Sequence, residues 1–123
     1  MKVIAYNISQ IDKQFLALAN HKRHKITIIS VPLDEATAYF AQAKDVVIIT
    51  GDDCSVSPSI FKILISLGVR YIIAWLNDPL KDDVAGIRND SLRWTSVRNA
   101  DPSGAWEVIN IINRWQKDDD DHN

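Results

Sequence analysis

The sequence has little of what several kinds of fold and site require. It contains one cysteine, Cys54, and therefore cannot form an internal disulfide; a reducing cytoplasm is the simplest setting for such a chain. No apolar run approaches the length of a membrane span, and the N-terminal apolar stretch is too short for a signal peptide. With 14 basic against 16 acidic residues, the net charge of −2 argues against a broad nucleic-acid-binding surface. We therefore expect a cytoplasmic protein that contacts neither nucleic acid nor membrane.

Glycine is equally scarce, and the four glycines of the chain are isolated from one another. The fingerprint G-x-G-x-x-G, which holds a dinucleotide at a helix N-terminus, is therefore absent. The three histidines, His21, His24 and His122, match no metal-ligand spacing. We expect neither a bound cofactor nor a metal ion.

The most informative stretch consists of two short apolar runs, 46–50 and 71–75, on either side of a helical segment predicted at Pro58–Leu67. Two β-branched runs around a helix are typical of a βαβ unit whose strands are buried on both faces. Ser57 and the proline after it fit the start of the helix. Gly68 fits its end, because glycine adopts the left-handed conformation without a Cβ clash.

The same patterns predict the other elements. Further strands are expected at 2–6, 26–31 and 93–97, and further helices at 11–20, after Asp34, and after Asp101 and Pro102. Helical spacing predicts inward-facing side chains in each of the three helices: Ile11, Phe15, Leu18 and Ala19; Ala36, Phe40 and Ala43; and Ala105, Val108, Ile109, Ile112 and Trp115.

Strands that alternate with helices at this spacing predict an α/β fold, a three-layer α/β/α sandwich around a five-stranded parallel sheet. The expected strand order is the flavodoxin-like 2-1-3-4-5. One domain should span residues 1–116, with residues 117–123 an acidic disordered tail. Ligands of such sheets bind where the strand order reverses. We call this place, at the carboxyl ends of the strands, the mouth of the sheet, and we expect residues 7–10, 50–54 and 76–79 to line it.

The residues at this mouth fit the usual ligands of the fold poorly. Flavin mononucleotide needs a small, glycine-containing loop after the first strand, and residues 7–12 include one serine and no glycine. A phosphorylatable receiver needs an acidic pair at that place to hold Mg²⁺, and Asn7 stands there instead. Asp52 and Asp53 could be a metal or acid–base pair, although residues of a turn before a helix are the simpler interpretation. Cys54 lacks the nearby histidine that a catalytic thiol requires.

Two helices could take part in contacts between protein chains. The helix at Ile60–Leu67 is apolar nearly all round, so it is either deeply buried or covered by a second copy in a homodimer. Ala105–Trp115 is the other candidate, because Trp106 falls off its apolar face. The basic run 21–25 is interpreted as a solvated helix end, with an anion or nucleic-acid contact as the alternative.

Three stretches resemble one known family. MKVIAYNISQID resembles the opening of D-isomer-specific 2-hydroxyacid dehydrogenases, in particular the D-lactate dehydrogenase branch, which typically begins MKIIAY before a short polar turn. LGVRYIIAW resembles the family's GVK-x-I strand, and SVRNADPSGAWEVINIINR resembles its NVPAYSPEAVAEHVINLI segment. The three stretches occur in the family's order and spacing and cover most of the chain.

The resemblance implies part of an enzyme. In the family this region begins the substrate lobe, and a separate NAD-binding domain supplies the Gly-rich loop and the catalytic Arg, Glu and His. The family's arginine after the first strand is replaced by Ser9, and the tyrosine of its PAYSP motif by Ala100. An acidic Asp78 and Pro79 stand where the family has a Gly-containing loop that contacts the substrate carboxylate. An anionic carboxylate would be repelled there.

We therefore expect a stand-alone homologue of the substrate lobe, catalytically inactive alone and used for small-ligand or protein binding. One alternative is the substrate-lobe subunit of a split dehydrogenase with a separate NAD-binding subunit; another is a receiver-like or flavodoxin-like signalling module. No catalytic residue is assigned. The candidate ligand-binding residues are those at the predicted mouth: Tyr6, Asn7, Ser9, Asp52, Asn77 and Asp78.

Overall fold

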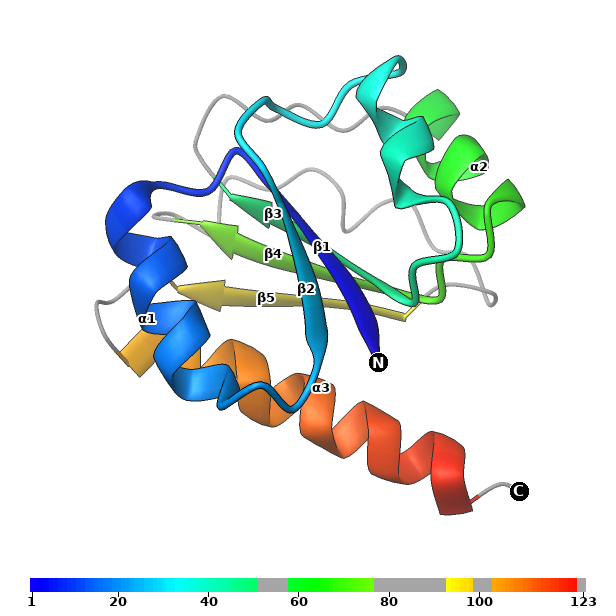
Figure 1. Ribbon diagram of the computed structural model, residues 1–123. Coiled ribbons are helices and arrows are strands. Elements are labelled where there is room, and N and C mark those ends of the chain that lie inside the picture. Colours follow the sequence, from blue (N-terminus) through cyan, green and yellow to red (C-terminus); the bar gives the residue numbers. More distant parts are fainter. Residues whose placement is uncertain (51–57, 77–92, 99–102, 122–123) are drawn as a thin grey trace.

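A parallel sheet of five strands forms the centre of the structure (Figure 1). The computed structural model describes residues 1–50, 58–76, 93–98 and 103–121. The strands are β1 (Lys2–Tyr6), β2 (Lys25–Ile29), β3 (Val46–Thr50), β4 (Tyr71–Leu76) and β5 (Arg93–Arg98). They are arranged β2-β1-β3-β4-β5, and every neighbouring pair is parallel. The predicted fold class and strand order are confirmed.

Helices cover both faces of this sheet. α1 (Gln10–Asn20) and α3 (Ser103–Asp121) lie on one face, and the 3₁₀ helix η1 (Thr37–Ala41) and α2 (Pro58–Ser66) lie on the other (Figure 1). Successive side chains of a strand point to opposite faces. Val3 and Ala5 of β1 therefore pack toward α1 and α3, and Ile4 and Tyr6 pack toward η1 and α2. Because both faces are covered, every residue of β3 is buried.

The inward face predicted for α1 is only partly right. Ile11 and Leu18 are each 58% exposed, and the buried positions are Asp12, Leu16 and Asn20. The side chain of Asn20 explains the difference. It accepts a hydrogen bond from His24 N at 2.9 Å and donates one to His24 O at 2.8 Å, which closes the turn into β2. A buried amide with both functions satisfied fixes the helix rotation here.

The segment after Asp34 also differs from its prediction. It forms a short 3₁₀ helix in which Ala38 and Ala41 are buried, three residues apart, while Phe40 is 56% exposed. The predicted inward face with Ala36, Phe40 and Ala43 was wrong, because a 3₁₀ helix repeats every three residues. Asp34 was predicted to cap this helix, but the N-cap residue of η1 is Ala36. The Asp34 carboxylate instead accepts hydrogen bonds from Ala36 N and Thr37 N, each at 2.8 Å, in the turn before the helix.

The ends of α2 and α3 complete the framework. Gly68 has φ +93°, and the next residue, Val69, donates its N–H to Leu64 O at 3.1 Å, so glycine ends α2 as predicted. α3 folds back over β4 and β5 and also contacts α1. It is helical to Asp121, so residues 117–121 form a helix where the sequence predicted a disordered tail. Ser57, Asp101 and Pro102, the predicted start residues of these helices, lie outside the described residues.

The side chains of α2 divide into two groups. Ile60, Phe61 and Leu64 are buried against the sheet. The remaining large apolar side chains of this segment are half-buried: Ile63, Ile65 and Leu67. The homodimer contact through Ile60–Leu67 therefore stays a prediction. In α3 the apolar face is covered by the chain's own sheet and by α1, and Trp106 stays 42% exposed.

Candidate functional site

Tyr6 ends β1 and is fully buried. Its hydroxyl donates a hydrogen bond of 2.7 Å to the carbonyl oxygen of Thr37 in η1. Burial raises the pKa of Tyr6 to about 12, with a smaller contribution from the negative charge of Asp34. The hydroxyl is therefore protonated at neutral pH and occupied by a contact that fastens η1 to the sheet. A ligand could reach it only by displacing that contact.

The next residues turn the chain from β1 into α1. Asn7 has φ +58° and donates its N–H to Ile29 O at 2.9 Å. An asparagine tolerates this left-handed conformation better than most residues. Ser9 caps α1, since its Oγ accepts a hydrogen bond from Asp12 N at 3.1 Å. Side chains of both residues lie at the carboxyl end of β1, where the strand order reverses.

β3 is joined to β1 at the same end of the sheet. The hydroxyl of Thr50 donates to the carbonyl oxygen of Tyr6 at 2.9 Å and is buried. The structure thus brings together three of the six predicted ligand residues, Tyr6, Asn7 and Ser9, with Thr50 beside them. Asp52, Asn77 and Asp78 lie outside the described residues, as do Asp53 and Cys54. Their contribution to a ligand site stays a prediction.

A second polar cluster, which the sequence did not predict, surrounds His24 at the opposite end of the sheet. His24 is 4% exposed, and its Nε2 lies 2.7 Å from Asn113 Oδ1 of α3. Its Nδ1 lies 3.1 Å from the amino group of Met1. Burial lowers the pKa of His24 from its ordinary value, and the nearby positive charges of Met1 and Arg23 lower it further, while the hydrogen bond to Asn113 acts in the opposite direction.

The neutral imidazole of His24 thus links the N-terminus to α3 through two hydrogen bonds. Its Nε2–H can donate to Asn113, and its Nδ1 can accept from Met1. The histidine lay in a charged run interpreted as solvated, and the sequence signal that could have distinguished it is the pair Asn20 and His24, four residues apart. The other members of this run, His21, Lys22, Arg23 and Lys25, are exposed as expected.

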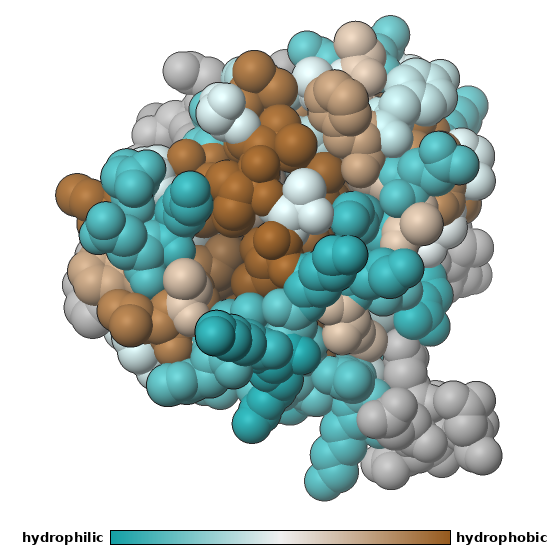
Figure 2. Space-filling model, viewed as in Figure 1, coloured by the Kyte–Doolittle hydropathy of each residue, from teal (hydrophilic) through white to brown (hydrophobic). Residues whose placement is uncertain are grey.

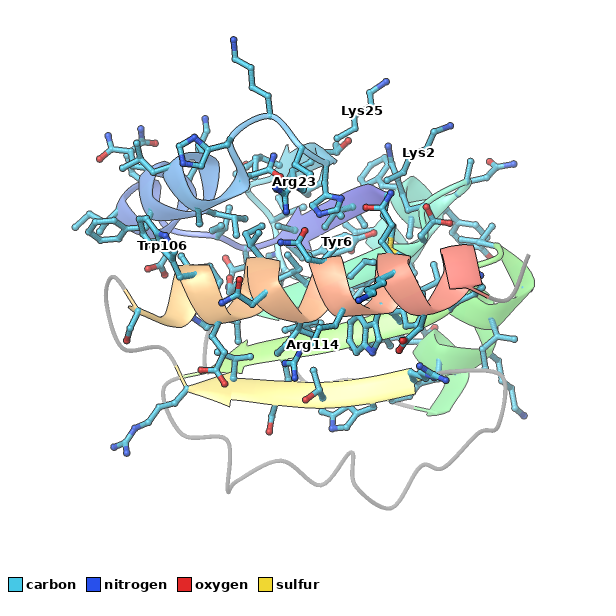
Figure 3. The ribbon with its side chains drawn as sticks, turned by 90° about the horizontal axis from the view of Figure 1, so that it is seen from below. Lys2, Tyr6, Arg23, Lys25, Trp106 and Arg114 are labelled. Carbon is cyan, nitrogen blue, oxygen red and sulfur yellow. The ribbon has the colours of Figure 1, made fainter. Side chains whose placement is uncertain are left out.

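Lys22, Arg23 and Lys25 of this run border a groove between α1 and β2. The groove has a volume of about 590 Å³, with an apolar floor from Leu16, Ile26 and Ile28. Figure 3 shows Arg23 and Lys25 in this region, with Lys2 close to Lys25. The residues on its rim carry positive charge: Lys13, Lys22, Arg23 and Lys25. The groove belongs to the amino-terminal half of β2 and is separate from the predicted mouth.

The described ranges contain no group of three or more His, Cys, Asp or Glu side chains placed to hold a metal ion. Over the same ranges, no helix combines the length and apolarity needed to cross a membrane.

Comparison with known proteins gives matches among solved structures. No protein-family model matches the chain, and no curated protein matches it. The structure of apo D-lactate dehydrogenase from Escherichia coli has 26% sequence identity, with a TM-score of 0.70 over 83% of this chain and 32% of that one. The pyruvate reductase of Chlamydomonas reinhardtii has 26% identity, with a TM-score of 0.67 over 96% of this chain and 36% of that one. Salmonella D-lactate dehydrogenase has 24% identity, with a TM-score of 0.70 over 79% and 30%.

These matches agree with the resemblance in the sequence. The chain spans about a third of the length of the solved structures that it matches. Several further neighbours are D-lactate or D-2-hydroxyacid dehydrogenases with the same coverage. In fold, this chain is therefore similar to a part of the D-2-hydroxyacid dehydrogenases.

Proposed function

We propose that this chain is a stand-alone homologue of the substrate lobe of D-2-hydroxyacid dehydrogenases. It does not oxidise or reduce hydroxyacids alone, and it binds a small polar ligand at the carboxyl ends of β1, β3 and β4. One observation carries the proposal. The chain superposes on E. coli D-lactate dehydrogenase over 83% of its own length with a TM-score of 0.70.

The packing of α3 supports an independent lobe. Ala105, Val108 and Ile112 of this helix are each at most 1% exposed and pack with β3, β4 and β5. They cover apolar surface of the sheet that would otherwise need a second domain or partner. The lobe therefore closes its own core on this face.

Two buried ionisable groups among the described residues, Tyr6 and His24, are poorly placed for hydride-transfer chemistry. Such a reaction needs a nicotinamide cofactor placed against the substrate and an acid or base within hydrogen-bond reach. Tyr6 is held protonated by burial and bonded to Thr37, and His24 lies at the opposite end of the sheet. Neither group is free to transfer a proton to a ligand at the mouth.

The mouth itself supports a small polar ligand. Asn7 is half-buried at the carboxyl end of β1 and presents an amide that can donate and accept hydrogen bonds. A ligand at such a switch point is held by the loops after the strands, while the sheet provides a rigid base.

An activity assay and a binding measurement together test the proposal. We expect the purified chain to give no change in NADH absorbance with D-lactate and NAD, or with pyruvate and NADH. Turnover of either pair by the chain alone would overturn the claim of inactivity.

The binding measurement is a two-dimensional NMR titration with the uncharged amides of D-lactate and pyruvate, and D-lactate and pyruvate themselves are the comparison because Asp78 is expected to repel an anion. We expect shifts confined to the residues around Asn7 and Thr50. The variant Asn7→Gly keeps the positive φ but removes the amide, and should abolish these shifts. Ala43→Gly is the matched control, because Ala43 also has positive φ (+64°) and lies before β3 at the opposite end of the sheet. Shifts that are equal in both variants would contradict the site.

A second candidate function is the substrate-lobe subunit of a split dehydrogenase, which is supported by the same similarity in fold to D-lactate dehydrogenases. Its test is co-expression with an isolated NAD-binding domain encoded in the same gene neighbourhood. Co-purification of the two chains and NAD-dependent turnover of a hydroxyacid would establish it. Separate elution without turnover would reject it.

A further inference from the structure

We propose that two copies of this chain associate edge to edge through β2, in antiparallel orientation about a two-fold axis, to form one continuous ten-stranded sheet. β2 is the terminal strand of the sheet, and within residues 1–50, 58–76, 93–98 and 103–121 no strand lies on its other side. The occupant of that side would be the β2 strand of the second copy. This inference is independent of the ligand site proposed at the carboxyl ends of β1, β3 and β4.

The backbone of β2 defines the contact. Lys25 N donates to Met1 O, and Ile29 O accepts from Asn7 N, so these two residues direct their backbone groups toward β1. Backbone groups alternate along a parallel strand. The N–H and C=O groups of Ile26 and Ile28 therefore point away from β1. These are the groups that a second strand would pair with.

The two edges of the sheet differ in a way that favours β2. Strands at natural edges are commonly protected by charged side chains. β5 begins and ends with exposed arginines, Arg93 and Arg98, and Arg93 forms an ion pair with Asp118 of α3. β2 has one charged residue, Lys25 at its start, followed by Ile26, Thr27, Ile28 and Ile29. The unprotected edge is thus the one with the higher β-propensity.

Apolar side chains gather along this edge. Figure 2 shows hydrophobic residues where β2 runs in Figure 1, with hydrophilic residues on either side of them. Ile26, Ile28 and Ile29 are half-buried, and Val31 is 42% exposed. Pairing with a second strand would remove much of this remaining apolar surface from water.

Charge selects a second copy in antiparallel orientation. Lys22, Arg23 and Lys25 are exposed at the beginning of β2, and Asp34 and Glu35 are exposed after its end. A two-fold axis across the strand brings the basic end of each copy to the acidic end of the other, and every contact then occurs twice. A parallel arrangement would instead place the basic ends together.

One side chain also restricts the register. Lys44 Nζ donates to Thr27 Oγ1 at 3.1 Å, so a cation lies beside the middle of β2 on the η1 face. If the two-fold axis passed through Thr27, the Lys44 side chains of the two copies would lie next to each other. An axis at Ile28 avoids that repulsion, pairs Ile28 with its own copy, and places Ile26 opposite Ser30 of the second copy. We infer the register centred on Ile28.

Amide hydrogen exchange followed by NMR tests the contact without any substitution. In the monomer, the amides of Lys25, Thr27 and Ile29 are bonded to β1, and those of Ile26 and Ile28 are open to solvent. We expect protection of Ile26 and Ile28 to rise with protein concentration, from about 10 μM to about 1 mM, in step with the mass measured by light scattering. A chain that stays monomeric at about 1 mM overturns the proposal. So does a dimer in which these two amides stay unprotected, which is the result expected for contact through α2.

Charge reversal tests the orientation. In this register Lys22 lies opposite Asp34, next to Glu35 of the second copy. Lys22→Glu should weaken the dimer about tenfold, because exposed ion pairs are individually weak but occur twice here. Glu35→Lys should weaken it by a similar factor, and the double variant should restore most of the affinity. Lys62→Glu on the exposed side of α2 makes the same change of charge away from β2 and should leave the dissociation constant within about twofold. Equal effects of Lys22→Glu and Lys62→Glu, or no recovery in the double variant, would contradict the antiparallel contact.

Discussion

At the scale of single residues, backbone conformation shows which positions carry strain. In the part of the chain that the structure describes, four non-glycine residues have positive φ: Asn7, His21, Lys22 and Ala43. Asparagine at such a position is common, because its short polar side chain tolerates the left-handed region. Ala43 has no such compensation, and its side chain is exposed, so no packing accounts for its presence.

Ala43→Gly should therefore stabilise the protein. We expect the free energy of unfolding to rise by about 0.5–1 kcal/mol, because glycine adopts φ +64° without the Cβ clash. Urea denaturation followed by circular dichroism measures the change. Ala36→Gly is the control, since Ala36 is also exposed but has φ −77°, and it should lose about 0.5–1 kcal/mol. If both substitutions changed the free energy of unfolding in the same direction, the explanation by backbone strain at Ala43 would be wrong.

At the scale of elements, two contacts of different kinds hold helices against the sheet. η1 is fastened by the hydrogen bond from the Tyr6 hydroxyl to Thr37 O. α3 approaches β4 closely at Gly104, where a Cβ would lie 2.7 Å from Trp75 Nε1 and 2.9 Å from Arg98 O. The first contact depends on a donor, and the second on the absence of a side chain.

Tyr6→Phe removes the donor and leaves the half-buried Thr37 carbonyl without this hydrogen bond. We expect a loss of about 1–2 kcal/mol in the free energy of unfolding, measured by urea denaturation. Tyr39→Phe serves as the comparison, because Tyr39 is 58% exposed, and it should change stability by less than about 0.5 kcal/mol. If both variants are equally stable, the hydroxyl of Tyr6 does not fasten η1.

Gly104→Ala forces α3 away from β4. Alanine has the higher helix propensity, by about 1 kcal/mol, but a methyl group at 2.7 Å from the Trp75 ring requires movement of a fully buried side chain. We expect a net loss of about 1–3 kcal/mol, together with a shift in the fluorescence of the buried tryptophan. Asn110→Ala lies on the same helix in an exposed position and should be neutral or slightly stabilising. A stabilising Gly104→Ala would show that the close approach has no energetic consequence.

At the scale of the whole molecule, His24 joins three distant parts of the chain. It contacts the amino group of Met1 and the side chain of Asn113, and the amide of Asn20 binds its backbone. Only the assembled fold brings residues 1, 24 and 113 together. Because His24 is held neutral, the charge state of this one residue is linked to the stability of the whole.

The pKa of His24 is lower in the folded state than its ordinary value of 6.5, chiefly because of burial. Below pH 6.5 the unfolded state therefore binds a proton that the folded state still excludes. We expect stability to be independent of this group above that pH, and to fall as the pH drops from 6.5 toward the folded pKa. His24→Gln should flatten this dependence in urea denaturation at a series of pH values. His21→Asn, which keeps a residue suited to φ +48°, should leave it unchanged. If the free energy of unfolding depended on pH equally in the two variants, His24 would not be the source of the pH dependence.

Much of this architecture can be predicted from the chain because buried parallel strands are short, β-branched and nearly continuous. Both faces of β3 are covered, so the run 46–50 could be recognised from its composition alone. The rotation of α1 could not. Apolar spacing predicted Ile11 and Leu18 inside, but the two hydrogen bonds of Asn20 to His24 determine which side faces the sheet.

The candidate site, too, could be predicted from the sequence only in part. Sequence position correctly placed Asn7 and Ser9 where the strand order reverses, because a parallel sheet brings the carboxyl ends of its strands to one edge. It could not show that the hydroxyl of Tyr6 is already bonded to Thr37. Partners that are distant along the chain become visible only when the fold is known.

The sequence by itself determined the five strands, their order and the helix stop at Gly68, because each depends on local composition or on the handedness of crossovers. Tertiary structure alone decided which polar groups are satisfied, which helix faces stay exposed, and that β2 rather than β5 has the unprotected edge. The physical reason is that burial and hydrogen bonding are properties of pairs of residues, and most of these pairs are far apart in the chain.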